Sequence, residues 1–140
     1  GLGDPMPRAA ASGRFSAFTQ LALVHPLASV PAPLSFTAGL YAGAFAFVSC
    51  GVSLGRGVLI NLHATVGHDV TVGDYTCIAP GANISGWCVI GKRCMIGTGA
   101  LLRQGVTVGD GARVGMGAVV LHDVPPGVTV IGNPARVLAM

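Results

Sequence analysis

An apolar residue recurs at every sixth position from Val24 to Val120, and the register never slips. Five of the six isoleucines in the chain belong to this register. A six-residue period fits neither the turn of an α-helix nor the simple alternation of a strand. It predicts one short strand and one tight corner, repeated many times along the chain. The register residues are Val24, Val30, Phe36, Ala42, Val48, Leu54, Ile60, Val66, Val72, Ile78, Ile84, Ile90, Ile96, Leu102, Val108, Val114 and Val120.

Glycine and small residues occupy the positions between the register residues. Glycine often follows the register residue and often recurs two places later, where corners need backbone angles that only glycine adopts without strain. The position four places after the register residue is usually Ala or Val, and strand alternation directs it inward. Cys88 and Cys94 fall in that column, so we predict that they are small core residues in a reducing compartment. Cys50 falls in a corner, and Cys77 is predicted to point outward.

This pattern resembles the hexapeptide-repeat acyltransferases, an all-β family with a left-handed parallel β-helix. The resemblance implies three repeats per triangular coil, so that residues eighteen apart stack at about 4.8 Å, the spacing of neighbouring strands. The left-handed sense comes from the resemblance, because ordinary crossover connections are right-handed. We expect about five coils over residues 24–124 and a looped C-terminal cap over residues 125–140. Residues 1–23 lack the repeat and are expected to be a remnant of, or linker from, an N-terminal α/β domain.

Charge and hydropathy argue against several other classes of protein. The net charge is only +3 and the basic residues are scattered, which does not suit a nucleic-acid-binding surface. Residues 1–20 lack the basic and apolar regions of a signal peptide. Residues 15–55 carry no formal charge, but three prolines interrupt this stretch and the six-residue register runs through it. We therefore expect a cytoplasmic protein without a membrane span, with a packing or subunit face in this region.

Two successive corners break the simple repeat. They carry polar and ionisable side chains where glycine and small residues would suffice, namely Asn61, His63, His68 and Asp69. In the eighteen-residue stack, Gly86 lies directly over His68, and Trp87 lies over Asp69. The missing side chain at Gly86 leaves room for a ligand and bares a backbone N–H, while Trp87 supplies an aromatic wall.

The His68-Asp69 pair suits proton transfer. Neutral imidazole is the natural base near pH 7. A carboxylate beside the ring favours its protonated form and increases its basicity. Taken alone, His68 is more simply interpreted as a surface histidine in a turn. With Gly86 stacked over the ring, a surface histidine and a base for proton transfer are equally favoured interpretations of His68.

The stretch from residue 58 to residue 138 is similar to one branch of the family. That branch contains sialic acid O-acetyltransferases and nucleotide-amino-sugar N-acetyltransferases. The resemblance implies an enzyme that moves an acetyl group from acetyl-CoA to the amino group of a nucleotide-linked sugar, with no metal. The alternative is O-acetylation of sialic acid or another sugar hydroxyl. The segments that carry the resemblance are Ile60-Asn61 and residues 67–74, 78–82, 85–86, 108–110 and 120–136.

The resemblance also implies roles for individual residues. His68 matches the general base, and Asp69 matches the acidic residue that increases its basicity. Gly86 matches a position near the tetrahedral oxyanion, which agrees with its bared N–H. Asn61 matches another site residue. Because Asn61 lies on the edge before His68, both can line one site only where neighbouring subunits of a homotrimer meet.

Further residues are expected to bind the substrates. Trp87 and His63 are candidates for the sugar site, although His63 can equally be a plain corner residue. Arg113 and Arg136 are candidates for phosphate contacts, with a solvated arginine as the alternative. Cys77 departs from the histidine that is common in the family, which weakens its expected polar contact with the coenzyme. The residues assigned to the coenzyme are Cys77, Gly97, Thr98, Gly115 and Met116.

Two other classes of function remain as rivals. His63 and His68, five residues apart, resemble the zinc-binding histidine pair of γ-class carbonic anhydrases. Those enzymes need a third histidine about two coils earlier, where this chain has Leu27, and two imidazoles alone hold zinc poorly. A non-catalytic scaffold is the second rival. It would not need the cluster of His68, Asp69, Gly86 and Trp87.

Overall fold

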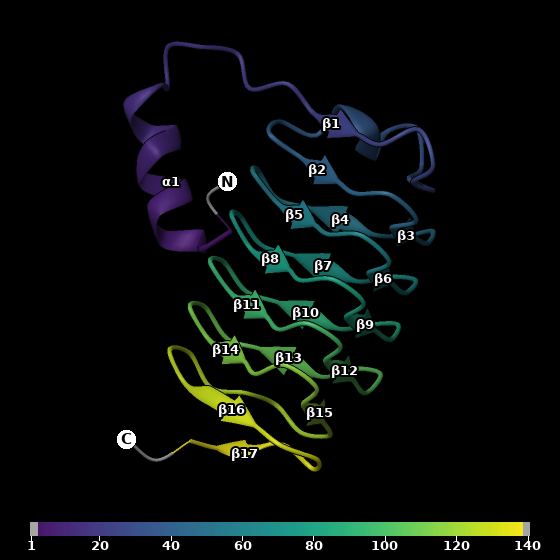
Figure 1. Cartoon of the computed structure of the whole chain (residues 1–140), viewed down its shortest axis with the longest axis vertical. Helices are drawn as coiled ribbons and strands as arrows, with labels where there is room; N and C mark the ends of the chain where they lie inside the picture. Colours follow the sequence, from purple (N-terminus) through teal and green to yellow (C-terminus); the bar gives the residue numbers. More distant parts are fainter. Residues whose placement is uncertain (1–2, 139–140) are drawn as a thin grey trace.

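Short parallel strands stack into three faces of a prism in the computed structural model, which describes residues 3–138 (Figure 1). Face 1 is the eight-stranded sheet, with β1 (Leu23–Val24), β2 (Tyr41–Ala42), β5 (Leu59–Ile60), β8 (Cys77–Ile78), β11 (Met95–Ile96), β14 (Arg113–Val114), β16 (Thr129–Ile131) and β17 (Arg136–Val137). Face 2 has β3 (Phe47–Val48), β6 (Thr65–Val66), β9 (Asn83–Ile84), β12 (Leu101–Leu102) and β15 (Val119–Val120). Face 3 has β4 (Ser53–Leu54), β7 (Thr71–Val72), β10 (Val89–Ile90) and β13 (Thr107–Val108).

The chain visits the faces in the order 1, 2, 3 and then returns to face 1 one coil further along. Neighbouring strands pair residues eighteen apart, as Ile60 with Ile78 on face 1 and Val66 with Ile84 on face 2. This confirms the expected left-handed parallel β-helix of hexapeptide repeats. The stack has about six coils, close to the expected five. We call the corners edge 1–2 (residues 61–64 and their equivalents), edge 2–3 (67–70) and edge 3–1 (73–76).

The two inward positions of each repeat form the core. The register residues from Ala42 onward are buried, except for half-buried Leu54, and so is the column of small residues four places later. Cys88 and Cys94 lie in that column and are fully buried, which confirms their prediction as core residues. Cys50 is exposed in its corner, as expected.

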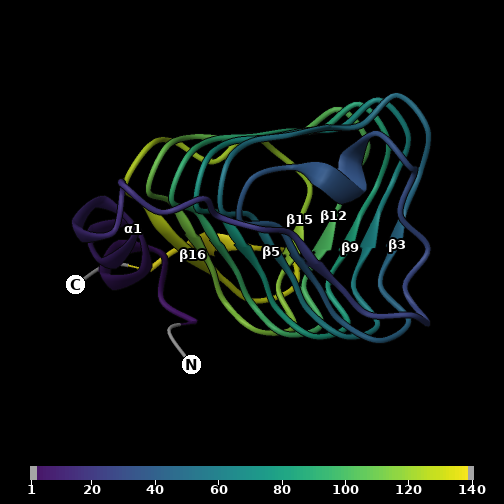
Figure 2. The same ribbon diagram turned by 90° about the horizontal axis from the view of Figure 1, so that it is seen from above.

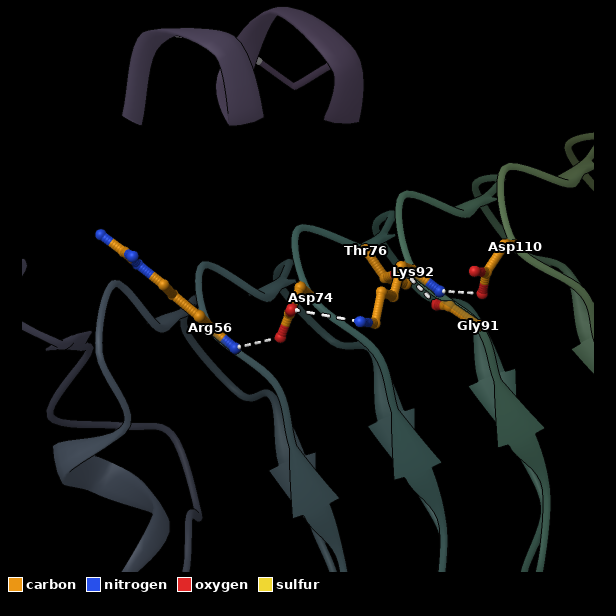
Figure 3. Close-up of polar contacts among 6 residues, drawn as sticks. All are labelled: Arg56, Asp74, Thr76, Gly91, Lys92 and Asp110. Carbon is orange, nitrogen blue, oxygen red and sulfur yellow. Dashed lines mark hydrogen bonds and ion pairs between the residues drawn. The ribbon is translucent and has the colours of Figure 1, made fainter. Parts of the chain in front are cut away.

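One polar residue, Thr76, lies in the core of edge 3–1. Its hydroxyl donates to the Gly91 carbonyl at 2.7 Å and accepts from the Cys94 N–H at 3.0 Å. It thus stands between two groups of the next coil that bond each other directly in most other corners, as the Ala82 N–H bonds the Ala79 carbonyl. Outside it, carboxylates cap backbone N–H groups of the preceding coil: Asp74 accepts from Arg56 at 3.0 Å, and Asp110 from Lys92 at 2.8 Å (Figure 3).

The N-terminal end of the prism departs from the repeat. The 3₁₀ helix η1 (Leu34–Phe36) stands where face 3 would have its first strand, and it lies across the top of the coils (Figure 2). Phe36, expected to be an inward register residue, is 85% exposed, so that expectation is wrong. Pro31 and Pro33 explain the difference, because proline has no N–H to donate to a strand ladder.

The C-terminal cap is more regular than the loop expected for residues 125–140. β16 pairs with β14 and continues face 1, and β17 returns antiparallel against β16. The register here pairs Arg113 with Thr129, sixteen residues apart. The shift begins in the corner after β15, which is two residues shorter than the others, because Val124 on face 3 already bridges Val108, sixteen residues earlier. Face 1 is therefore extended by a hairpin.

Helix α1 (Pro5–Arg14) lies outside the coils, beside face 1 (Figures 1 and 2). Asp4 caps its first turn by accepting the Met6 N–H at 2.9 Å. Arg8 donates to the carbonyls of Tyr75 and Thr76 on edge 3–1. Within residues 3–138, no helix is long and apolar enough to cross a membrane.

Candidate active site

His68 and Asp69 form a hydrogen-bonded pair on edge 2–3. The Nδ1 atom of His68 lies 2.9 Å from Oδ2 of Asp69. The pair lies at the surface, with 42% of the His68 side chain and 50% of the Asp69 side chain exposed. With Nδ1–H donating to the carboxylate, the lone pair of the neutral imidazole resides on Nε2. The corner thus presents an oriented base whose free nitrogen faces away from its carboxylate partner.

Gly86 and Trp87 enclose that free nitrogen from the next coil. A Cβ placed on Gly86 would lie 2.5 Å from His68 Nε2 and 2.7 Å from its Cε1, so only glycine leaves room for the ring. Trp87 meets the imidazole edge-to-face, with ring centroids 4.6 Å apart at 86°. Within the described chain, no hydrogen-bond acceptor meets the Gly86 N–H. A free donor therefore lies beside the base.

Asp69 and Trp87 hold left-handed backbone conformations, with φ of 57° at each. Such angles favour glycine, which stands at the equivalent position of many other corners. In the preceding coil, the space over Gly51 is filled by the Asp69 carboxylate, which a Cβ there would displace. Gly51 was not among the predicted site residues, although its place eighteen residues before Asp69 in the stack could have indicated it.

Asn61 and His63 lie on a different edge, 1–2, separated from His68 by strand β6. The Asn61 Oδ1 atom accepts the Leu62 N–H at 2.9 Å. The His63 ring stacks on Phe45, with centroids 5.0 Å apart and an angle of 20°. The single chain does not bring these residues to His68, and their sharing of one site across subunits stays a prediction.

A shallow groove of about 340 Å³ lies between edge 1–2 and face 1. It brings together four of the five residues assigned to the coenzyme: Gly97, Thr98, Gly115 and Met116. A Cβ on Gly97 would lie 2.6 Å from the Met116 backbone nitrogen, so glycine is needed for the coils to stack here. The groove also includes Arg113 and Met95 from face 1.

Cys77, the fifth residue assigned to the coenzyme, does not line this groove. Its side chain points away from the prism axis, as expected, but it is only 4% exposed because α1 covers face 1 at this point. Burial raises the pKa of the Cys77 thiol, against the opposing effect of the nearby Arg8 guanidinium. The expectation that an outward Cys77 would be accessible is therefore corrected. Its coenzyme contact stays a prediction.

Potential metal ligands are dispersed. Over residues 3–138, no three His, Cys, Asp or Glu side chains lie close enough together to hold one metal ion. The sequence contains a second adjacent His-Asp pair, His122-Asp123, after β15. The Asp123 carboxylate accepts the Thr107 N–H at 2.8 Å. That contact is a structural cap like those on edge 3–1.

Comparison with known proteins places this geometry in a family. The family model "Bacterial transferase hexapeptide (six repeats)" matches residues 88–122. WeeI from Acinetobacter baumannii AYE is 32% identical, with a TM-score of 0.89, over 97% of this chain and 68% of that chain. The chain belongs to the hexapeptide-repeat transferases. No curated protein sequence matches the chain.

Two further structures of hexapeptide-repeat transferases align with this one. A histidine variant of perosamine N-acetyltransferase from Caulobacter crescentus, in complex with CoA and GDP-perosamine, is 28% identical with a TM-score of 0.89, over 99% of this chain and 67% of that one. The acetyltransferase domain of PglB from Neisseria gonorrhoeae FA1090, in complex with acetyl coenzyme A, is 36% identical with a TM-score of 0.79, over 97% and 67%. This chain thus spans about two thirds of their length.

Proposed function

We propose that this hexapeptide-repeat transferase moves an acetyl group from acetyl-CoA to the amino group of a nucleotide-linked sugar. The donor follows from the family, since the aligned structures include complexes with CoA and with acetyl coenzyme A. The acceptor class is suggested by the GDP-perosamine in the N-acetyltransferase complex. The observation that carries the proposal is the His68–Asp69 pair, whose free Nε2 lies under Gly86.

In the proposed reaction, His68 Nε2 takes a proton from the acceptor amine while the nitrogen attacks the thioester carbonyl carbon. The carbonyl π electrons move to oxygen and form a tetrahedral oxyanion, for which the free Gly86 N–H is a suitable donor. When the oxyanion collapses, the carbon–sulfur bond breaks, and the departing thiolate takes the proton from the imidazolium. Asp69 orients the ring and stabilises its positive charge throughout.

The active unit in this proposal is a homotrimer. Asn61 and His63 on edge 1–2 of one subunit would face His68 on edge 2–3 of its neighbour. The separation of these residues on two edges of the single prism supports this arrangement. The acetylated sugar and free coenzyme would leave from the cleft between subunits.

Replacement of His68 tests the function. The purified chain, acetyl-CoA and a panel of nucleotide-linked amino sugars are combined, and thiol release and acetylated product are both measured. His68→Ala should lower kcat by at least about 100-fold, because general base catalysis contributes that much, while coenzyme affinity stays unchanged. Asp69→Asn should have a partial effect.

Matched acceptors in which a hydroxyl replaces the amine distinguish N-acetylation from O-acetylation. Transfer to the hydroxyl acceptors alone would contradict the proposed acceptor class. A His68→Ala variant with full turnover would contradict the proposed base.

A further inference from the structure

Among residues 3–138, the groove between edge 1–2 and face 1 is lined by a single charged residue. Its lining consists of apolar side chains, threonines and glycine backbone, apart from the guanidinium of Arg113 on β14. Coenzyme A carries several phosphate negative charges, and a guanidinium matches phosphate oxygens with paired N–H donors. Arg113 therefore stands where the charge of such a ligand would need a partner.

The same guanidinium already has a partner from α1. Asp4 Oδ2 lies 3.2 Å from Arg113 Nη2, and both side chains are about half exposed. The other oxygen of Asp4 accepts the Met6 N–H. The Met6 hydrogen bond and the Arg113 guanidinium hold the pKa of Asp4 below its usual range, so this carboxylate is ionised at neutral pH.

We propose that Arg113 binds a phosphate group of the coenzyme and that Asp4 competes for the same guanidinium. This inference rests on the proposed acetyl-CoA-dependent function. A phosphate entering the groove displaces the Asp4 carboxylate from Nη2 or shares the guanidinium with it. In either case the negative charge of Asp4 opposes the incoming negative charge. Coenzyme affinity is thereby set partly by α1, an element outside the coils.

Calorimetric titration of the full chain with coenzyme A tests the Arg113 contact. Arg113→Gln should weaken binding about tenfold, as expected for the loss of a hydrogen bond to a charged group. Arg14→Gln is the matched control, because it removes the same charge at the far, exposed end of α1 and should leave affinity unchanged. Circular dichroism of each variant checks that the coils are intact.

Asp4→Asn tests the competition. Asparagine is as good a helix cap as aspartate, so the Met6 contact survives while the charge is lost. Coenzyme binding should become about threefold tighter, the size expected for an exposed ion pair. In an Arg113→Gln background the same substitution should have no effect, since its target is gone. Both effects should shrink as salt is raised.

Two coenzyme fragments identify the phosphate. If Arg113→Gln weakens binding of coenzyme A but not of dephospho-coenzyme A, the contact is with the 3′-phosphate. If it weakens binding of both, and of 4′-phosphopantetheine, the contact is with the phosphate next to the pantetheine arm. Either pattern supports the proposal.

Three results would overturn this inference. Coenzyme binding that is as tight in Arg113→Gln as in Arg14→Gln removes the phosphate contact. Weaker binding in Asp4→Asn, or tighter binding that persists without Arg113, removes the competition. Failure of the unaltered chain to bind coenzyme A or acetyl-CoA is a different outcome, because it removes the proposed function itself.

Discussion

Gly86 contributes to the candidate site through the side chain it lacks. The imidazole of His68 occupies the volume that a Cβ on Gly86 would fill, and the Gly86 N–H has no acceptor within residues 3–138. The φ of Gly86 is not in the left-handed region. In the next coil, Gln104 stands at the equivalent position. The backbone there accepts a side chain, so glycine is needed for the sake of His68.

Gly86→Ala should therefore reduce activity and spare the fold. The new methyl group displaces the imidazole from Asp69, and we expect a loss of at least about tenfold in kcat/KM, since a small misplacement of a base is costly. Steady-state assays with a thermal unfolding control measure this. In a His68→Ala background the substitution should add no further loss. An additional loss there would mean that Gly86 acts independently of the ring.

At the scale of elements, the corners hold the coils together as much as the strands do. Each strand is only two residues long over most of the stack, so each coil relies on hydrogen bonds made at its edges. On edge 3–1 these come from Asp74, Asp110 and the buried Thr76 (Figure 3). Thr76 is the one polar residue among the buried side chains of the described chain.

Thr76→Val should destabilise the β-helix without creating a cavity. Valine has nearly the same shape and occurs at the equivalent inward position in Val58 and Val70. The substitution leaves the buried Cys94 N–H without its acceptor, which should cost about 1–3 kcal/mol of unfolding free energy. Urea unfolding measures the difference. Val58→Thr is the matched control, because it makes the opposite substitution at an equivalent buried position. It should also lower the unfolding free energy. An unchanged Thr76→Val midpoint would contradict the structural role.

For the whole molecule, buried thiols make stability sensitive to alkaline pH. Burial raises the pKa of Cys94, whose thiol donates to the Gly109 carbonyl at 3.1 Å. A raised folded-state pKa gives stability that is fully present below the pKa of the unfolded thiol, about 8.5, and lost as pH rises through the folded-state pKa. The unfolding free energy of the unaltered chain should thus fall more steeply above pH 8.5 than that of Cys94→Ala.

Cys50→Ala is the control for the loss of a thiol at an exposed position. Parallel curves for Cys94→Ala and the unaltered chain would contradict the effect of burial. Lysine, arginine and tyrosine also contribute to the pH dependence of the unfolding free energy. Their contributions are the same in the unaltered chain, Cys94→Ala and Cys50→Ala, so they cancel in the comparison.

The trimer proposal predicts complementation between two inactive variants. If Asn61 of one subunit serves His68 of the next, Asn61→Ala and His68→Ala chains that are unfolded and refolded together will form some intact clefts. If equal amounts of the two chains assemble at random, about one quarter of the clefts will contain both native Asn61 and native His68. About one quarter of the activity of the unaltered protein should therefore return. Each variant refolded alone is the control. No recovery in the mixture would contradict a site shared between subunits.

Much of this fold follows from sequence because the repeat is periodic and each inward position is constrained by the coil above it. The site on edge 2–3 was predictable for the same reason, since the eighteen-residue stack relates His68 to Gly86 and Asp69 to Trp87. The position of α1 was not predictable, because it depends on contacts of Asp4 and Arg8 with distant coils. The burial of Cys77 follows from the position of α1, whereas the exposure of Phe36 follows from the two prolines before η1.

Asp69 and Trp87 hold left-handed corners in the middle of a glycine-rich solenoid, and this has an evolutionary consequence. A non-glycine residue in that conformation is strained by about 1 kcal/mol or more, although aspartate tolerates it better than tryptophan. Drift toward glycine at these two positions would relax the coil, but it would also remove the carboxylate partner of the proposed base and the indole ring beside it. Selection for stability therefore favours glycine at these two positions, whereas selection for activity favours Asp69 and Trp87.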